Sequence, residues 1–137
     1  GIFKEDAGRV ETYIGRSPAD RTKMAVVPKE KGRYAATNFE VVRRFAAGYT
    51  LVRFRLETGR THQIRVHCKH LGHPIVGDPV YGSKRQKFKL NGQLLHACRL
   101  ELTHPKTGER MAFEAPLPAY FSEVLEKLDR EERGRAR

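Results

Sequence analysis

Apolar and charged side chains alternate most regularly in the stretch 49–57. The apolar face carries Val52, Phe54 and Leu56, and the opposite face carries Arg53, Arg55 and Glu57. A period of two is typical of a strand with one buried face. Residues 34–45 are rich in β-forming side chains, and Gly48 separates the two runs. The pattern therefore predicts an antiparallel hairpin.

Shorter β-forming runs occur at residues 10–14, 24–27, 98–103 and 110–113. Pro28 ends the second of them, and a turn with a proline and a glycine joins the last two. Several strands with few helices predict an α+β fold, with a mixed, mostly antiparallel sheet and a few flanking helices.

Two helices are predicted from apolar spacing near 3.6 residues. The first runs from a Thr61 cap to Leu71, with Gly72 as its C-terminal cap. Its apolar side holds Ile64, Cys68 and Leu71, and its cationic side holds His62, Arg65 and Lys69. The second helix carries the core stripe Phe121, Val124, Leu125 and Leu128. The domain is thus predicted to span 1–128, and 129–137 to be a charged, disordered tail.

The net charge of +11 is concentrated in the middle of the chain. Residues 41–90 hold eleven Lys and Arg against two Asp and Glu, which accounts for +9 of the total. Clustered cations favour a polyanion, because binding to phosphates releases counterions. RNA, DNA and acidic lipid all fit this criterion.

The chain shows no sign of a membrane segment or of a disulfide framework. No apolar run approaches the about 20 residues that span a bilayer, and no leader-like stretch opens the sequence. A cytoplasmic location is therefore predicted. The two cysteines, Cys68 and Cys98, are expected to be buried thiols.

The segment 56–67 carries the densest chemistry of the sequence. It joins a strand end, a glycine turn and a helix start, and it holds two arginines and two histidines. A helix N-terminus offers free N–H groups and a partial positive charge, so anions bind there. Arg65 can pair with a carboxylate or a phosphate through two hydrogen bonds.

Other side chains admit a structural and a functional interpretation. Among the histidines between residues 62 and 73, His67 and His70 could share a metal ion, but no carboxylate or cysteine completes a zinc spacing, so no metal site is expected. Asp78 is either an acid or base or the cap of its own turn. Tyr81 either stacks on a nucleobase or packs beneath its glycine-rich loop. A nuclease built on His62 and His67 has no support beyond composition.

Five longer motifs occur in one order along the chain: LETGRTHQIRVH at 56–67, GHPIVGDPVYG at 72–82, LHA at 95–97, LTHPKTGE at 102–109 and FEAPLP at 113–118. Upstream, RTKMAV at 21–26 and AT at 36–37 belong to the same series. Together they resemble the RluA/RluD-type RNA pseudouridine synthases over nearly the whole chain. Several matches in the family's order are far more specific than one short match.

The resemblance implies an isomerase that converts uridine to pseudouridine in structured RNA, without a metal or organic cofactor. In this family an aspartate attacks the target nucleotide after the base has been flipped out of its stack. The arginine of the Ile-Arg pair forms an ion pair with that aspartate, and the next apolar residue packs in the uracil pocket. By position these two residues are Arg65 and Val66.

The sequence departs from the family at the nucleophile. The family's aspartate lies in an Arg-Leu-Asp motif before these segments, whereas the aspartates of this chain, Asp6, Asp20, Asp78 and Asp129, have a different context. The pocket tyrosine of a Tyr-x-Ala segment is missing as well, and Gly1 matches the glycine that ends it. The chain alone is therefore expected to be inactive. It is expected to need the N-terminal half of the same domain, or to self-associate through exposed sheet edges.

RNA is the expected partner, with ribosomal RNA favoured over transfer RNA and no membrane involved. The side chains expected to contact RNA are Arg21, Lys23, Arg60, His62, Lys69, Lys84, Arg85 and Lys87. The alternative, from another functional class, is a non-catalytic RNA-binding module that has kept the synthase scaffold.

Overall fold

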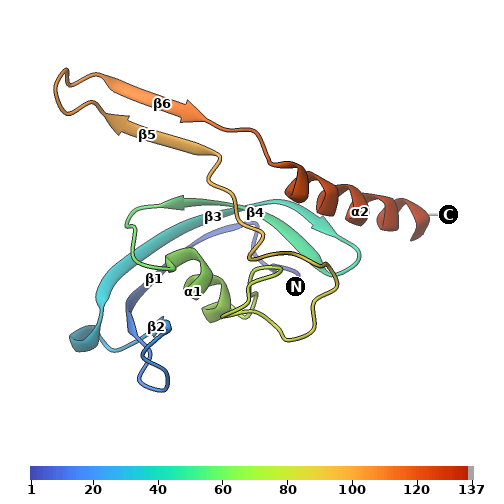
Figure 1. Ribbon diagram of the computed structural model, residues 1–137, viewed down its shortest axis with the longest axis horizontal. Coiled ribbons are helices and arrows are strands. Elements are labelled where there is room, and N and C mark those ends of the chain that lie inside the picture. Colours follow the sequence, from blue (N-terminus) through green and yellow to red (C-terminus); the bar gives the residue numbers. More distant parts are fainter. Residues whose placement is uncertain (136–137) are drawn as a thin grey trace.

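Four antiparallel strands form the main sheet, in the order β2-β1-β3-β4. They are β1 (Ala7–Arg16), β2 (Met24–Val26), β3 (Arg33–Phe45) and β4 (Tyr49–Leu56), with the 3-10 helix η1 (Lys29–Lys31) before β3. This computed structural model describes residues 1–135. Figure 1 shows the sheet curling around helix α1 (Gln63–His70), which packs on one of its faces. The predicted α+β class is confirmed.

The predicted hairpin of β3 and β4 is confirmed. Its turn contains Gly48 with φ = +94°, a conformation that glycine adopts without steric cost. Arg53 and Arg55 face solvent as predicted, but Leu56 is 48% exposed. The apolar face is therefore only partly covered towards the end of β4, which is an edge strand of the sheet.

The first strand is longer than the pattern predicted. β1 begins at Ala7, opposite Glu40 of β3, and its ladder with β3 continues to Ile14. Its last residues pair with β2, which ends before Pro28 as predicted. The ladder extends through polar residues because main-chain hydrogen bonds, and not only apolar side chains, define the length of a strand.

Helix α1 starts later than predicted and has a different cap. Its N-cap position is His62, which adopts a left-handed conformation (φ = 56°) and makes no side-chain capping bond, so Thr61 is not the cap. At the other end Gly72 has φ = +80°. The N–H of Gly72 donates to the carbonyl of Lys69 and that of His73 to the carbonyl of Cys68, both at 2.9 Å. This pair of bonds is a Schellman motif, and it confirms the predicted end of the helix.

The predicted faces of α1 are partly wrong: Arg65 was placed on an exposed cationic side and is only 9% exposed. The other well-buried residues of the helix are Gln63, Val66, His67 and Cys68. Ile64 and Leu71, expected in the core, are half-buried. The helix is rotated from the expected orientation because the sheet beneath it presents threonine hydroxyls, which bind polar side chains.

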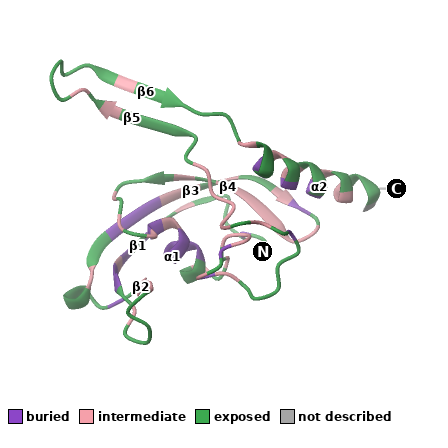
Figure 2. Ribbon diagram, viewed as in Figure 1, coloured by how far each residue is buried: buried purple, intermediate pink, exposed green. Residues whose placement is uncertain are grey.

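The core has two parts, shown in purple in Figure 2. The first lies between the sheet and α1 and contains Ile14, Ala35, Val66 and Tyr81. The second lies beneath helix α2 (Ala119–Arg135) and contains Phe45, Phe88, Val124 and Leu128. The predicted apolar stripe of the last helix is confirmed, since Phe121, Val124 and Leu128 are buried and Leu125 is half-buried.

Residues 129–135, assigned at the sequence level to a disordered tail, are described by the structure as the end of helix α2. Helix α2 continues to Arg135, and its last turns bind the body of the protein. Arg43 donates to Asp129 at 2.7 Å and also to Glu132, and Lys87 lies 2.6 Å from Glu131. These ion pairs hold the end of the helix, where the apolar stripe is missing. Residues 136–137 lie outside the described part of the chain. Neither of the described helices is long and apolar enough to cross a bilayer.

A second sheet, the hairpin of β5 (Arg99–Thr103) and β6 (Arg110–Glu114), extends away from the body as an arm (Figure 1). It confirms the predicted strands and the turn at 105–108, where Gly108 completes the reversal. Leu100 and Phe113 pair directly across it and are 58% and 50% exposed. Leu102 and Met111 form the next apolar pair. One face of the arm is thus apolar and uncovered in the described residues.

The two cysteines have different environments. Cys68 is buried as predicted, and burial raises the pKa of its thiol to about 12, which makes it unreactive at neutral pH. Cys98 is exposed just before β5, contrary to the prediction. It is exposed because the β5–β6 arm, which begins directly after Cys98, extends away from the core.

Candidate active site

Arg65 and Asp78 form a buried, two-pronged ion pair. The Nε of Arg65 donates to Oδ2 of Asp78, and Nη2 donates to Oδ1, each at 2.9 Å. Asp78 is only 2% exposed, and its Oδ1 also accepts the N–H groups of Val80 and Tyr81 at 3.0 Å. Asp78 therefore caps its own turn, which was the structural interpretation of this residue.

The ion pair holds both partners in their charged forms. Burial alone would raise the pKa of the Asp78 carboxyl, but the bonds from Arg65, Tyr81 and Val80 outweigh it and hold that pKa below its usual value. The same hydrogen bond raises the pKa of Arg65. Arg65 uses Nε and Nη2 in this pair, and no described residue bonds its Nη1. One edge of the guanidinium remains for another anion.

Tyr81 connects this pair to the start of α1. Its hydroxyl lies 2.8 Å from Nδ1 of His62 and accepts the N–H of Met24 at 2.9 Å. The guanidinium carbon of Arg65 lies 5.1 Å from the centre of the tyrosine ring. The ring is 4% exposed, so Tyr81 packs beneath its loop, which was its structural interpretation.

His62 is held neutral beside Arg65. Burial, and then the charge of Arg65, lower the pKa of its imidazole. Since the Tyr81 hydroxyl already accepts from Met24, it can donate its proton to Nδ1 of His62. His62 also has φ = 56°, a conformation uncommon outside glycine, asparagine, aspartate and histidine. Non-glycine residues held in this backbone region are frequent at functional sites.

Val66, which the resemblance places in the uracil pocket, lies in the first core cluster and is 4% exposed. It packs with Ile14, Ala35 and Tyr81. Val66 follows Arg65 directly, so the two residues are tied to one turn of α1. A contact between Val66 and uracil stays a prediction.

A buried polar network beneath α1 was missed at the sequence level. The ring nitrogens of His67, Nε2 and Nδ1, lie 2.7 Å from the hydroxyls of Thr12 and Thr37. Gln63 donates to the Thr37 hydroxyl at 2.9 Å and to the carbonyl of Ala36 at 3.0 Å. Thr12 occupies the inward position between Val10 and Ile14, which is the signal that could have revealed it.

This network fixes the charge state of His67. Burial, with a smaller contribution from His70, lowers the pKa of His67 to about 4. A neutral imidazole donates from one ring nitrogen and accepts at the other, so one of the two threonine hydroxyls accepts from the ring and the other donates to it. A second ring proton would remove the acceptor nitrogen. His67 is thus a neutral structural residue that holds α1 on the sheet.

The histidines considered for a metal do not converge. His67 is enclosed by two threonines, and His73 stacks on Phe3 with ring centres 4.6 Å apart. No group of three or more His, Cys, Asp or Glu side chains within residues 1–135 is placed to hold a metal ion.

The side chains expected to contact RNA lie in several places. Lys84, Arg85 and Lys87 are exposed on the loop that follows Tyr81, and Lys69 is exposed at the end of α1. Arg21 lines a groove of about 530 Å³ together with Arg16, Pro18, Val27 and Lys31. Lys23 is half-buried beside β2, and Arg60 donates to the carbonyl of Tyr34 at 2.8 Å. Only His62 lies with Arg65 in the cluster around Tyr81.

A family model described as RNA pseudouridylate synthase matches residues 2–70. This range contains the four strands of the main sheet and helix α1, which carries Arg65. The chain belongs to this family. It is 51% identical over 123 residues to a protein of Chloroflexus aurantiacus named as an uncharacterized RNA pseudouridine synthase. The alignment covers 90% of this chain and 38% of that protein. It is 46% identical over 138 residues to ribosomal large subunit pseudouridine synthase D of Pseudomonas aeruginosa, with coverage of 90% and 42%.

The solved structures confirm the synthase fold. Human RNA pseudouridylate synthase domain containing 1 superposes with a TM-score of 0.71 at 27% identity, over 94% of this chain and 62% of that chain. The chain spans about two fifths of the length of the curated relatives named above.

Proposed function

We propose that this chain is part of an RNA pseudouridine synthase that isomerises uridine in structured RNA, with ribosomal RNA favoured over transfer RNA. The observation that carries the proposal is Arg65, a charged and almost fully buried arginine with one free edge, in the segment that matches the family. The large-subunit ribosomal names of several relatives support the choice of RNA. Modification of ribosomal RNA by this protein agrees with the predicted cytoplasmic location.

Asp78 cannot serve as the nucleophile, because both of its oxygens accept hydrogen bonds and the side chain is almost inaccessible. In this proposal the attacking aspartate belongs to the upstream half of a family catalytic domain, and it pairs with the free edge of Arg65. A positive partner keeps such a buried carboxylate ionised and therefore nucleophilic. Asp78 and Tyr81 hold the guanidinium in place for it.

In the reaction the C1′–N1 bond of uridine breaks, the base turns, and a C1′–C5 bond forms. The proton on C5 is lost to solvent, and N1 takes up a proton, so the product is an isomer of the substrate. Val66 contacts the flipped uracil, and cations of the segment 41–90 bind the RNA backbone.

The experiment is tritium release from RNA labelled at uridine C5, with the chain alone and with the upstream half of a family catalytic domain added. We expect no release from the chain alone and release from the mixture, because the nucleophile enters only with the second piece. Release by the chain alone would contradict the assigned roles. No release from either, with salt-sensitive RNA binding by a folded complex, would favour the non-catalytic RNA-binding module.

The apolar face of the β5–β6 arm is proposed to pack against that same upstream half. Leu100 and Phe113 are too exposed to contribute much to the stability of the chain by itself. When the upstream half is absent, a second copy of the chain can bind instead, either through this apolar face or through the free edge of β4.

Replacing Phe113 with Thr is therefore expected to reduce concentration-dependent self-association of the chain, as measured by sedimentation velocity. Threonine keeps the β-propensity of the strand and removes the large apolar surface. Tyr120→Thr is the matched control, because Tyr120 is an equally exposed aromatic residue (49%) on α2. Equal effects of both substitutions would mean that the arm has no special part in association.

A further inference from the structure

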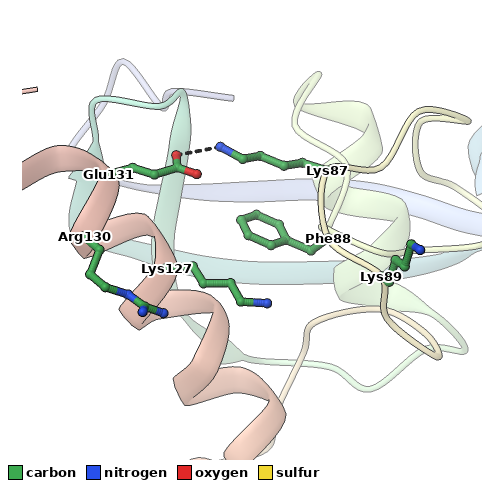
Figure 3. Close-up of a pocket in the computed structure, with 6 residues that line it drawn as sticks. All are labelled: Lys87, Phe88, Lys89, Lys127, Arg130 and Glu131. Carbon is green, nitrogen blue, oxygen red and sulfur yellow. Dashed lines mark hydrogen bonds and ion pairs between the residues drawn. The ribbon is translucent and has the colours of Figure 1, made fainter. Parts of the chain in front are cut away.

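A cationic groove lies between helix α2 and the loop that follows Tyr81. Its volume is about 550 Å³, and it is lined by Lys87, Phe88, Lys89, Lys127, Arg130 and Glu131 (Figure 3). The first three residues belong to the loop and the last three to α2. Figure 3 shows Lys127 extending from the helix towards the part of the loop that carries Phe88.

The loop side of this groove is anchored to α2 through Phe88. Phe88 is 7% exposed and packs with Phe45, Val124 and Leu128 in the second core cluster, so it anchors the loop to the helix. Tyr49 adds an edge-to-face contact with a ring-centre distance of 5.6 Å. A site with rigid walls loses less conformational entropy when a ligand binds.

The groove has a strong excess of positive charge. Four cations line it against one carboxylate, Glu131, and that carboxylate is already bound by Lys87 at 2.6 Å. Lys89, Lys127 and Arg130 have no ion-pair partner in the described part of the chain. Three uncompensated cations in one groove are expected to bind a polyanion.

One loop connects the groove to the candidate active site. It leaves Tyr81, carries the exposed Lys84 and Arg85, and then reaches Lys87 and Phe88 of the groove. The sequence alone predicted Lys84, Arg85 and Lys87 as RNA contacts. Lys89, Lys127 and Arg130 were not among them, and Arg130 fell in the predicted tail.

We propose that this groove binds the phosphate backbone of the RNA strand that flanks the target uridine. The choice of RNA rests on the proposed function; the choice of phosphates rests on the groove itself. Ammonium and guanidinium groups bind phosphate oxygens well, and the only aromatic ring is buried and offers no face for a base. Binding is therefore tolerant of sequence and depends on salt.

The first test removes the two α2 cations with Lys127→Gln/Arg130→Gln. Affinity for a fluorescein-labelled RNA stem-loop is followed by anisotropy between about 50 and about 200 mM KCl. The salt slope is expected to fall by about 1 to 2, since each lost phosphate contact removes roughly 0.7 to 0.9 from it. Lys29→Gln/Lys106→Gln, two exposed cations outside the groove, is the control with the same change of charge and should leave the slope nearly unchanged.

The second test adds affinity instead of removing it. Glu131→Gln frees Lys87 and takes the only carboxylate out of the groove, so tighter RNA binding and a steeper salt slope are expected. Glu126→Gln changes the same charge on the same helix outside the groove and is expected to have a much smaller effect.

Equal effects of the groove variants and their controls would overturn the inference and leave the groove to a different partner, such as an acidic protein. Such a result would not affect the proposed function, which tritium release tests separately. Conversely, groove-dependent RNA binding by a reconstituted protein that forms no pseudouridine would contradict the proposed function and support the groove.

Discussion

Replacing Arg65 with Met is expected to lower the free energy of unfolding by about 3–5 kcal/mol. The substitution leaves the Asp78 carboxylate buried, with the N–H groups of Val80 and Tyr81 but without its cation. A loss of this size is a large fraction of the about 5–15 kcal/mol that stabilises a typical domain. Urea unfolding at pH 7, followed by circular dichroism, measures it.

Two further variants make this prediction specific. Arg65→Met/Asp78→Asn removes both charges and is expected to be less destabilised than the sum of the two single substitutions, because no buried charge remains unpaired. Arg99→Met breaks ion pairs with Glu101 and Glu114 on the exposed arm, where solvent screens the charges and a much smaller loss is expected. If Arg65→Met costs no more than Arg99→Met, the buried ion pair does not stabilise the chain as described.

Acidification from pH 6.5 to pH 4 is expected to remove roughly 3 kcal/mol of stability through His67 alone, at about 1.4 kcal/mol per pKa unit. The imidazole has a pKa of about 4 in the folded chain, well below the usual 6.5 of a free histidine. The unfolded chain therefore binds a proton first as the pH falls. The contribution of His67 is fully present above pH 6.5 and is lost as the pH falls towards 4.

The measurement is the free energy of unfolding at several pH values for the unaltered chain and for His67→Gln. His62 and His73 also have lowered pKa values and contribute in the same direction, so the difference between the two proteins isolates His67. His70→Gln is the control, because His70 is exposed on the same helix. A His67→Gln chain that keeps the full pH dependence would show that His67 is not the group that titrates. The lowered pKa of Asp78 acts only at still lower pH, near the range in which free aspartates titrate.

Local patterns revealed most of the elements. The β3–β4 and β5–β6 hairpins and the stripe of α2 were predictable because alternation, turn residues and helical spacing lie within a few residues of one another. The orientation of α1 was not predictable, because it depends on Thr12 of β1 and Thr37 of β3. The end of α2 was missed for the same reason, since its acidic residues are held by Arg43 and Lys87 from distant segments.

The candidate site was half visible in the sequence. Arg65 was identified from its motif, but Asp78 was considered as an acid or base or as the cap of its own turn, and not as the partner of Arg65. The pairing brings two motifs together in space, and neither motif contains that information alone. The buried positions of Gln63 and His67 were missed because a polar side chain on a helix is expected to be exposed unless the facing strand is known.

The cluster around Arg65 is assembled from a single short stretch of the chain. The partners Arg65 and Asp78 are 13 positions apart, and His62 and Tyr81 are 19 apart. The entropy of closing a loop rises only with the logarithm of its length, so loops this short close at little cost. The guanidinium can therefore reach its final orientation early in folding, as soon as α1 lies on the sheet. Under the proposed function, an incoming aspartate would then meet an arginine that is already ordered, and docking of the second piece would limit the rate of assembly.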